Sequence, residues 1–238
     1  MKAVRRSGRI VKPSTRVERG HWNAGRSLVV GADAVGVACL SGPVLAAAVV
    51  MPPFARRIPG IRDSKMLSRA QRERLYPLIL RRAVAVGLGA ASVREIDRIN
   101  IYHATNLAMR RAICRIPGRE HVLIDGLRVH RLEDHVGAYT AIVRGDAHCY
   151  SIAAASIVAK VIRDRLMDRL AARHPHYAWE HNAGYATLAH RRGIDEHGLT
   201  AFHRRSFARI KAAALGHQLE LDLVAFDLSE PLGDPVPA

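Results

Sequence analysis

The chain has 238 residues, of which 49% are hydrophobic and 24% are charged, and this composition supports one sizeable α/β domain. Lysine and arginine number 37 against 21 acids, for a formal net charge of +16. Such a surface favours polyanions by steering phosphates and releasing their counterions, although a generally basic composition without a partner explains it too. No apolar run is long enough for a membrane span, no secretion signal is visible, and three cysteines without metal-ligand spacing predict a cytoplasmic protein.

The first segment, residues 1–26, is predicted to be a disordered basic arm. It carries eight lysines and arginines against the single acid Glu18, without apolar periodicity. It either grips phosphates loosely or only aids solubility. Residues 27–215 are expected to form one domain, and residues 216–238 an acidic, flexible tail that is interrupted by prolines.

Five apolar or β-branched runs predict strands, at residues 28–32, 44–51, 84–88, 122–124 and 139–143. Helices are predicted from the N-cap Ser68 to about Arg82, from Glu95 to Ile113 with a break near Asn100, and over residues 151–170. Two or more smaller helices are expected within residues 186–215. This order predicts an α/β fold with a mixed five-stranded sheet, flanking helices and a small C-terminal helical region.

Three aspartates lie at or just beyond predicted strand ends: Asp33, Asp125 and Asp146. Loops at strand ends are where polar side chains converge without disrupting the core. Carboxylate oxygens suit hard divalent cations, and a bound cation offsets the repulsion between clustered acids. The alternative for each residue is local, because Asp125-Gly126 is also a turn signal and Asp146 also suits a helix cap.

A series of short motifs runs along residues 27–209. The first is Gly31-Ala32-Asp33 with Gly36 and Gly42-Pro43-Val44. The others follow in this order: Asp63-Ser64-Lys65, Glu95-Ile96-Asp97, Asn100-Ile101, Leu123-Ile124-Asp125-Gly126, Gly145-Asp146-Ala147, residues 151–160, Arg163-Asp164, Gly184-Tyr185 and His203-Arg204-Arg205-Ser206-Phe207. In content and order these motifs resemble the ribonuclease HII family.

The resemblance implies an RNase H-like fold and a monomeric, two-metal endonuclease that uses Mg²⁺ or Mn²⁺. Its implied substrates are RNA–DNA hybrids and duplex DNA containing ribonucleotides, cut on the 5′ side of the ribonucleotide. Asp33, Asp125 and Asp146 match three of the four family metal ligands and catalytic acids. The resemblance also implies nucleic-acid-binding positions, which contact phosphates, support such contacts or, for a tyrosine, stack on a sugar. They are Gly36, Lys65, Ser156, Lys160 and Tyr185. Tyr185 packing beneath a glycine turn is the alternative for that residue.

The chain departs from the family pattern on one loop. The family has an Asp-Glu pair followed by Gly-Arg-Gly, whereas Ala34, Val37 and Ala38 replace the glutamate, the arginine and the second glycine. A Cβ at Ala38 hinders close backbone approach to a ribose, and Val37 cannot pair with phosphate. His148 replaces a lysine often seen in the family and is a poor Mg²⁺ ligand.

Two functions therefore stay open from the sequence. One is a hybrid-cleaving endonuclease that is weakened or Mn²⁺-dependent, and the other is a catalytically inactive paralogue that binds RNA–DNA hybrids. Four histidines of the C-terminal part are interpreted as solvated surface residues because their spacing fits no zinc site: His174, His176, His181 and His190. Asp63 and Asp164 are expected to cap or pair locally.

Overall fold

The computed structural model describes residues 12–208 and 210. Its centre is a five-stranded sheet in the order β3-β2-β1-β4-β5, made of β1 (Val29–Val35), β2 (Val44–Val50), β3 (Ala85–Ala91), β4 (His121–Asp125) and β5 (Tyr139–Ile142). Strands β1, β2 and β3 are antiparallel neighbours, whereas β4 and β5 run parallel to β1. The predicted α/β class and mixed sheet are confirmed.

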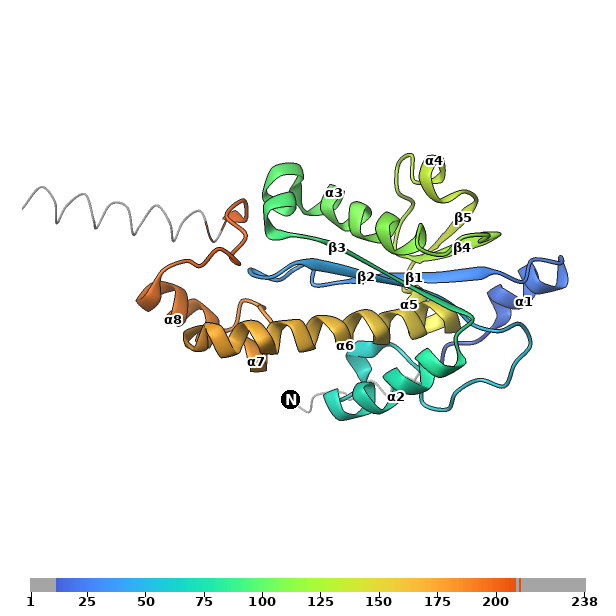
Figure 1. The fold of residues 1–238 in the computed structure, drawn as a ribbon, viewed down its shortest axis with the longest axis horizontal. Helices are drawn as coiled ribbons and strands as arrows, with labels where there is room; N and C mark the ends of the chain where they lie inside the picture. The colour runs from blue at the N-terminus through green and yellow to red at the C-terminus, as the bar shows by residue number, and fades with distance from the viewer. Residues whose placement is uncertain (1–11, 209, 211–238) are drawn as a thin grey trace, which may run out of the picture.

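Helices cover both faces of the sheet (Figure 1). Helix α3 (Val93–Ile113) packs on one face, and α6 (Tyr150–Arg173) with α2 (Arg69–Arg82) packs on the other. The break in α3 lies at Asn100, with φ 64° and ψ 170°, where the sequence predicts it. Short elements complete the described chain: η1 (Ser64–Met66), α4 (Glu133–Val136), α5 (Gly145–His148), η2 (Pro175–Tyr177), α7 (Trp179–Asn182) and α8 (Leu188–His197).

The sequence of α6 lets this helix lie close against β1. Its buried face is rich in alanine, and Gly31 on β1 faces its first turn. A Cβ on Gly31 would lie 2.3 Å from the carbonyl carbon of Ser151, a separation that no side chain tolerates. This close approach brings the segment before α6, which contains Asp146, up to the end of β1.

The N-terminal segment corrects one prediction. Residues 16–23, expected to be disordered, form helix α1 (Arg16–Asn23), in which Glu18 and Trp22 are buried. Trp22 packs against Leu123 and Ile152 beside the sheet, so the arm docks by burying an aromatic ring. Residues 1–11 and the predicted acidic tail lie outside the described residues. Within the described part of the chain, the helices are too short or too polar to cross a membrane.

Candidate active site

Three aspartates converge where β1, β4 and α5 meet, and we call them the acidic centre: Asp33, Asp125 and Asp146. Ala32 pairs with Ile124 in the parallel register of β1 and β4, so the next two residues, Asp33 and Asp125, lie at the same level of the sheet. Asp125 ends β4 as predicted, whereas Asp33 lies within β1, which continues to Val35, and not beyond its end. Period-two alternation turns Asp33 and Asp125 away from the α3 face of the sheet and toward α6. The backbone N–H of Gly145 donates to Asp125 Oδ1 at 2.7 Å, which ties the loop before Asp146 to β4.

The three aspartates of the acidic centre lie close enough for the charge of one to shift the pKa of another. Burial, followed by the negative charges of Asp125 and Asp146, raises the pKa of Asp33 to about 7. Burial and the charge of Asp146 likewise raise the pKa of Asp125. Close like charges disfavour the ionised form of each acid, so the centre carries more negative charge than its own surroundings stabilise.

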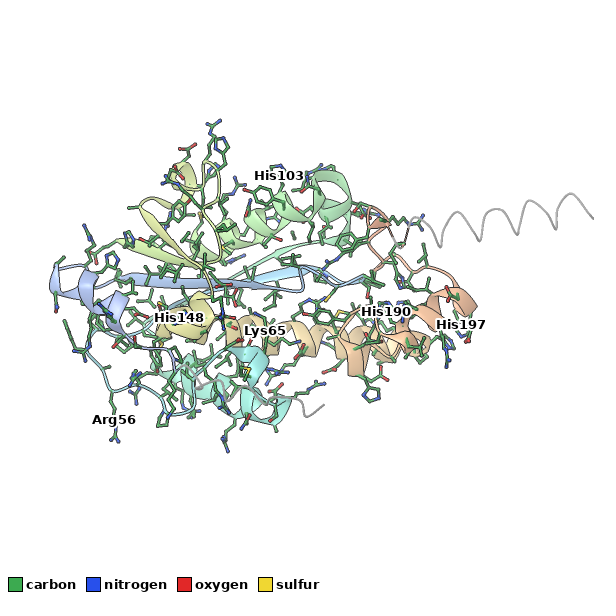
Figure 2. All side chains as sticks on the ribbon, turned by 180° about the vertical axis from the view of Figure 1, so that it is seen from behind. Arg56, Lys65, His103, His148, His190 and His197 are labelled. Carbon is green, nitrogen blue, oxygen red and sulfur yellow. The ribbon has the colours of Figure 1, made fainter. Side chains whose placement is uncertain are left out.

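Lys65 is the cation that contacts the acidic centre. Its Nζ lies 3.0 Å from Asp146 Oδ2, and although burial lowers its pKa, the hydrogen bond and charge of Asp146 raise it by more. Lys65 is mostly exposed, and it lies between His148 and His190 along the length of the molecule (Figure 2). Asp63 accepts a hydrogen bond from the Lys65 N–H at 2.9 Å, which confirms its predicted capping role.

A divalent cation fits the acidic centre in donor chemistry and in charge. All three groups offer carboxylate oxygen, the donor that Mg²⁺ and Mn²⁺ prefer, and a cation at the centre would offset the burial and the repulsion that raise the pKa of Asp33. Among residues 12–208 and 210, no three acidic, histidine or cysteine side chains are close enough to enclose a metal ion. The three aspartates therefore do not form a closed metal cage.

The loop after β1 is fixed by buried arginine. Gly36 has φ +85°, and an added Cβ would lie 2.1 Å from Arg163 Nε, so only glycine fits. Arg204 is fully buried and donates to the carbonyl oxygens of Gly36 and Val37 at 2.6 and 2.8 Å. These bonds present the side chains of Val37 and Ala38 to solvent. The loop is thus rigidly held even though its sequence lacks the family's arginine and second glycine.

Ala34 lies on the other side of β1 from Asp33. Its methyl group packs against the apolar cluster beneath α3, and its N–H donates to Asp33 Oδ1 at 2.7 Å. Alanine at this position offers no oxygen atom to the acidic centre.

Tyr185 and Lys160 line a cavity of about 230 Å³ between α2, α6 and α7. Tyr185 is 43% exposed, and Lys160 Nζ lies 6.0 Å from the centre of its ring. The exposed ring face can stack on a planar or sugar surface. This exposure weighs against the alternative in which Tyr185 only packs beneath its glycine turn.

Ser156 occupies a supporting position. It is fully buried, and its Oγ lies 2.6 Å from Ser64 Oγ, beside Lys65. Asp164 accepts hydrogen bonds from Lys160 at 2.5 Å and from Arg72 at 3.0 Å. The local pairing expected for Asp164 thus exists with Lys160 one helical turn away and extends to α2. Together these contacts fix the segment that carries Lys65 against α6.

The prediction of a surface histidine is wrong for His190. Its ring is fully buried, its Nε2 accepts from Trp179 Nε1 at 3.0 Å, and its Nδ1 lies 2.9 Å from the carbonyl oxygen of Tyr185. His203 Nε2 is 3.2 Å from His190 Nε2. We call Trp179, His190 and His203 the histidine cluster. It holds the backbone at Tyr185, whereas His176 and His181 are exposed as predicted.

Sequence reasoning missed the positioning roles of two buried arginines. Arg163 donates to the carbonyl oxygens of Ser41, Pro43 and Ala183, and it thereby links the loop after β1 to the segment before Tyr185. Arg204 holds the same loop from the C-terminal side. Both residues lie in motifs that the sequence singles out, but arginine alone gives no signal of burial, because its usual place is at the surface.

Comparison with known proteins gives a consistent result. The family model described as Ribonuclease HII matches residues 30–210. Ribonuclease HII of Thermosynechococcus vestitus is 51% identical over 81% of this chain and 89% of its own length, and that of Granulibacter bethesdensis is 49% identical over 86% and 92%.

Solved structures share the fold. Ribonuclease H2 from Pyrococcus horikoshii is similar with a TM-score of 0.66 at 21% identity, over 80% of this chain and 98% of that one. Bst ribonuclease HIII in complex with Mn²⁺ is similar with a TM-score of 0.59 at 19% identity, over 82% and 71%.

Proposed function

Because the chain belongs to the ribonuclease HII family, we propose that it is an endonuclease acting on RNA–DNA hybrids or on the 5′ side of ribonucleotides embedded in duplex DNA. The convergence of Asp33, Asp125 and Asp146 beside Lys65 carries this proposal. The cofactor would be Mg²⁺ or Mn²⁺, and a solved ribonuclease HIII of the same fold holds Mn²⁺.

The proposed roles follow from position. Asp33, Asp125 and Asp146 would hold the divalent ions, which when bound activate water and stabilise the leaving oxygen. Lys65, exposed beside Asp146, would contact a phosphate oxygen. Gly36 keeps the backbone of its loop close to the bound strand, with Arg204 holding that loop.

Recognition would fall to the cavity beside α6. Tyr185, which is 43% exposed, would stack on a sugar of the duplex, with Lys160, paired to Asp164, beside its ring. Ser156 has a supporting role through Ser64. His190 would act through the backbone of Tyr185, as a positioning residue rather than a contact.

Activity is proposed to be weakened by Ala34. Two divalent ions bring four positive charges, and three carboxylates balance them less well than four. Loss of metal stabilisation in the transition state is worth several kcal/mol, which corresponds to a rate loss on the order of 10²–10⁴-fold. The second candidate function is a non-cutting protein that binds hybrids, and the combined loss of acid, arginine and glycine at Ala34, Val37 and Ala38 favours it.

Cleavage separates the two candidates. The substrates are duplex DNA with a single ribonucleotide and a continuous RNA–DNA hybrid, each incubated with Mg²⁺ and with Mn²⁺. An Asp125→Asn variant is run beside the wild type. Cutting that disappears with Asp125→Asn supports the endonuclease. Retained hybrid binding without cutting under either metal supports the binding protein instead.

A further inference from the structure

A basic surface lies outside the acidic centre, where the loop after β2 meets the end of α2. We define this basic patch by six residues: Lys12, Arg56, Arg57, Arg62, Arg81 and Arg82. They line two adjoining cavities of about 560 and 430 Å³, which share Arg56 and Arg57, and no acidic side chain lines either cavity. Within the described residues none of the six forms an ion pair.

Hydrogen bonds and a buried side chain fix the backbone of the basic patch. Ile58 is buried, and its N–H donates to Tyr150 Oη at 2.7 Å. Arg57 donates to the carbonyl oxygen of Pro13, and Arg82 to that of Arg56, both at 2.8 Å. These bonds use one nitrogen of each guanidinium and leave the others available. Arg62 Nε is buried without a partner among the described residues.

The patch is adjacent to the acidic centre along the chain. Arg62 precedes Lys65 by three residues, and Tyr150 follows Asp146 by four, so the backbone separation is at most about 10–14 Å. Arg56 lies farther out, toward the end of the molecule where His148 rather than His190 is found (Figure 2). The patch thus comes within three residues of Lys65 at Arg62 and reaches toward one end of the molecule at Arg56.

We propose that the basic patch binds backbone phosphates of the duplex flanking the cleaved position, an inference that rests on the proposed function. Guanidinium groups bind phosphate oxygens in pairs, and free nitrogens on several arginines suit a repeating anion better than a single one. At a rise of about 3.4 Å per base pair, a patch about 10–20 Å away corresponds to about three to six base pairs from the cut.

The test compares two triple variants with equal charge. R56Q/R57Q/R62Q removes three patch cations. R94Q/R98Q/R115Q is the control, because these arginines are exposed on or just after α3, across the sheet, and form no ion pair within the described chain. Affinity is measured without divalent metal, so nothing is cut. The duplexes contain one ribonucleotide and are extended by about 10 base pairs, one helical turn, on one side or the other.

We expect the wild type to gain affinity when one particular side is extended, and the patch variant to lose that gain, by about tenfold or more at low salt. The salt slope of log affinity should fall by about 2–3, since each lost phosphate contact removes about 0.9. The control variant should keep the preference for that side. Equal losses in both variants, or an unchanged patch variant, would overturn the proposal; the latter result would point to an acidic protein partner.

Failure of the proposed endonuclease function would be distinguishable from failure of the basic-patch proposal. Binding is measured on uncut duplex, so a wild type that never cleaves can still show the side-specific gain. The converse result is cleavage that depends on Asp125 while the patch variant binds like the wild type. That result supports the endonuclease function and overturns only the proposal for the basic patch.

Discussion

The acidic centre and the histidine cluster are both buried polar groups, but they differ in how well they are satisfied. In the histidine cluster, the Thr200 N–H donates to His203 Nδ1 at 2.9 Å, and His190 Nδ1 lies beside the carbonyl oxygen of Tyr185 and donates to it. The single lone pair of His190 Nε2 is shared by two N–H groups, those of Trp179 and His203. Each ring nitrogen of the two histidines has a polar partner, and the cluster needs no charge from outside.

The acidic centre is the opposite case. Its carboxylates repel one another, and the nearest counter-charge is the exposed Lys65. A buried polar network that is fully paired stabilises a fold, whereas one with excess charge lowers stability until a ligand compensates it. The difference supports the proposal that the acidic centre binds a cation, whereas the histidine cluster holds the backbone at Tyr185.

The largest expected effect comes from completing the acidic centre. Ala34→Glu should raise the cleavage rate by about 10²–10⁴-fold, because a fourth carboxylate restores charge and an oxygen ligand. Ala34→Gln, with equal length and no charge, should not. Single-turnover cleavage with Mg²⁺ measures both. Equal rates for Ala34→Glu and Ala34→Gln would show that the missing charge is not what limits this site.

Removing charge from the same centre should stabilise the metal-free protein. Asp33→Asn should raise the free energy of unfolding by about 2–4 kcal/mol at pH 8, because it removes the repulsion and the burial of charge that displace the pKa of Asp33. Urea unfolding in a chelator measures this. Asp195→Asn, at an exposed position on α8, is the control. A destabilised Asp33→Asn would contradict the contrast drawn above.

Acid should disrupt the histidine cluster. Burial and the neighbouring His190 lower the pKa of His203 to about 3, so its contribution to stability is present above about pH 6.5 and is lost as the pH falls toward 3. At pH 5 the loss is about 2 kcal/mol. Urea unfolding from pH 7 to 5 should show a shallower pH slope in His203→Asn and an unchanged slope in His181→Gln. An NMR titration that places the His203 pKa near 6.5 in the folded protein would refute this prediction.

Glu18 lies between these two cases, because one of its carboxylate oxygens is paired and the other is not. Its substitution should give the smallest effect on stability. Its Oε1 accepts from the Ser151 N–H at 2.7 Å and caps α6, while its Oε2 is buried without a partner among the described residues. Glu18→Ala should cost about 1–2 kcal/mol, as loss of a helix cap does, and Glu18→Gln should cost less. Urea midpoints measure both, with the exposed Glu196→Ala on α8 as control. No loss in Glu18→Ala would show that the cap contributes nothing.

Structural features that depend on neighbouring residues could be predicted from the sequence. Asp33 and Asp125 follow apolar runs, Ser68 forms the predicted cap with Gln71, and Asn100 interrupts α3. The runs placed Asp125 correctly at the end of β4, but β1 continues past Asp33 to Val35, so Asp33 lies within its strand and not at the strand end.

Signals that depend on distant partners were not readable. Glu18 looked like the one acid in a basic arm, because its partners at residues 149 and 151 are 131 and 133 residues away. His190 looked solvated because its burial is set by Trp179 and His203 in three dimensions. The resemblance located Tyr185, but its exposure is a property of the folded chain.

The bridge between Ser14 and Cys149 sets an order of events during synthesis. Ser14 N–H donates to the carbonyl oxygen of His148, and Tyr150 N–H donates to that of Ser14. The arm emerges from the ribosome first, yet it cannot dock until residue 150 has also emerged, and closing so long a loop is slow. The backbone around Asp146 therefore reaches its final form only late in synthesis, so a nascent chain stopped before that point carries β1 and β4 without a finished acidic centre.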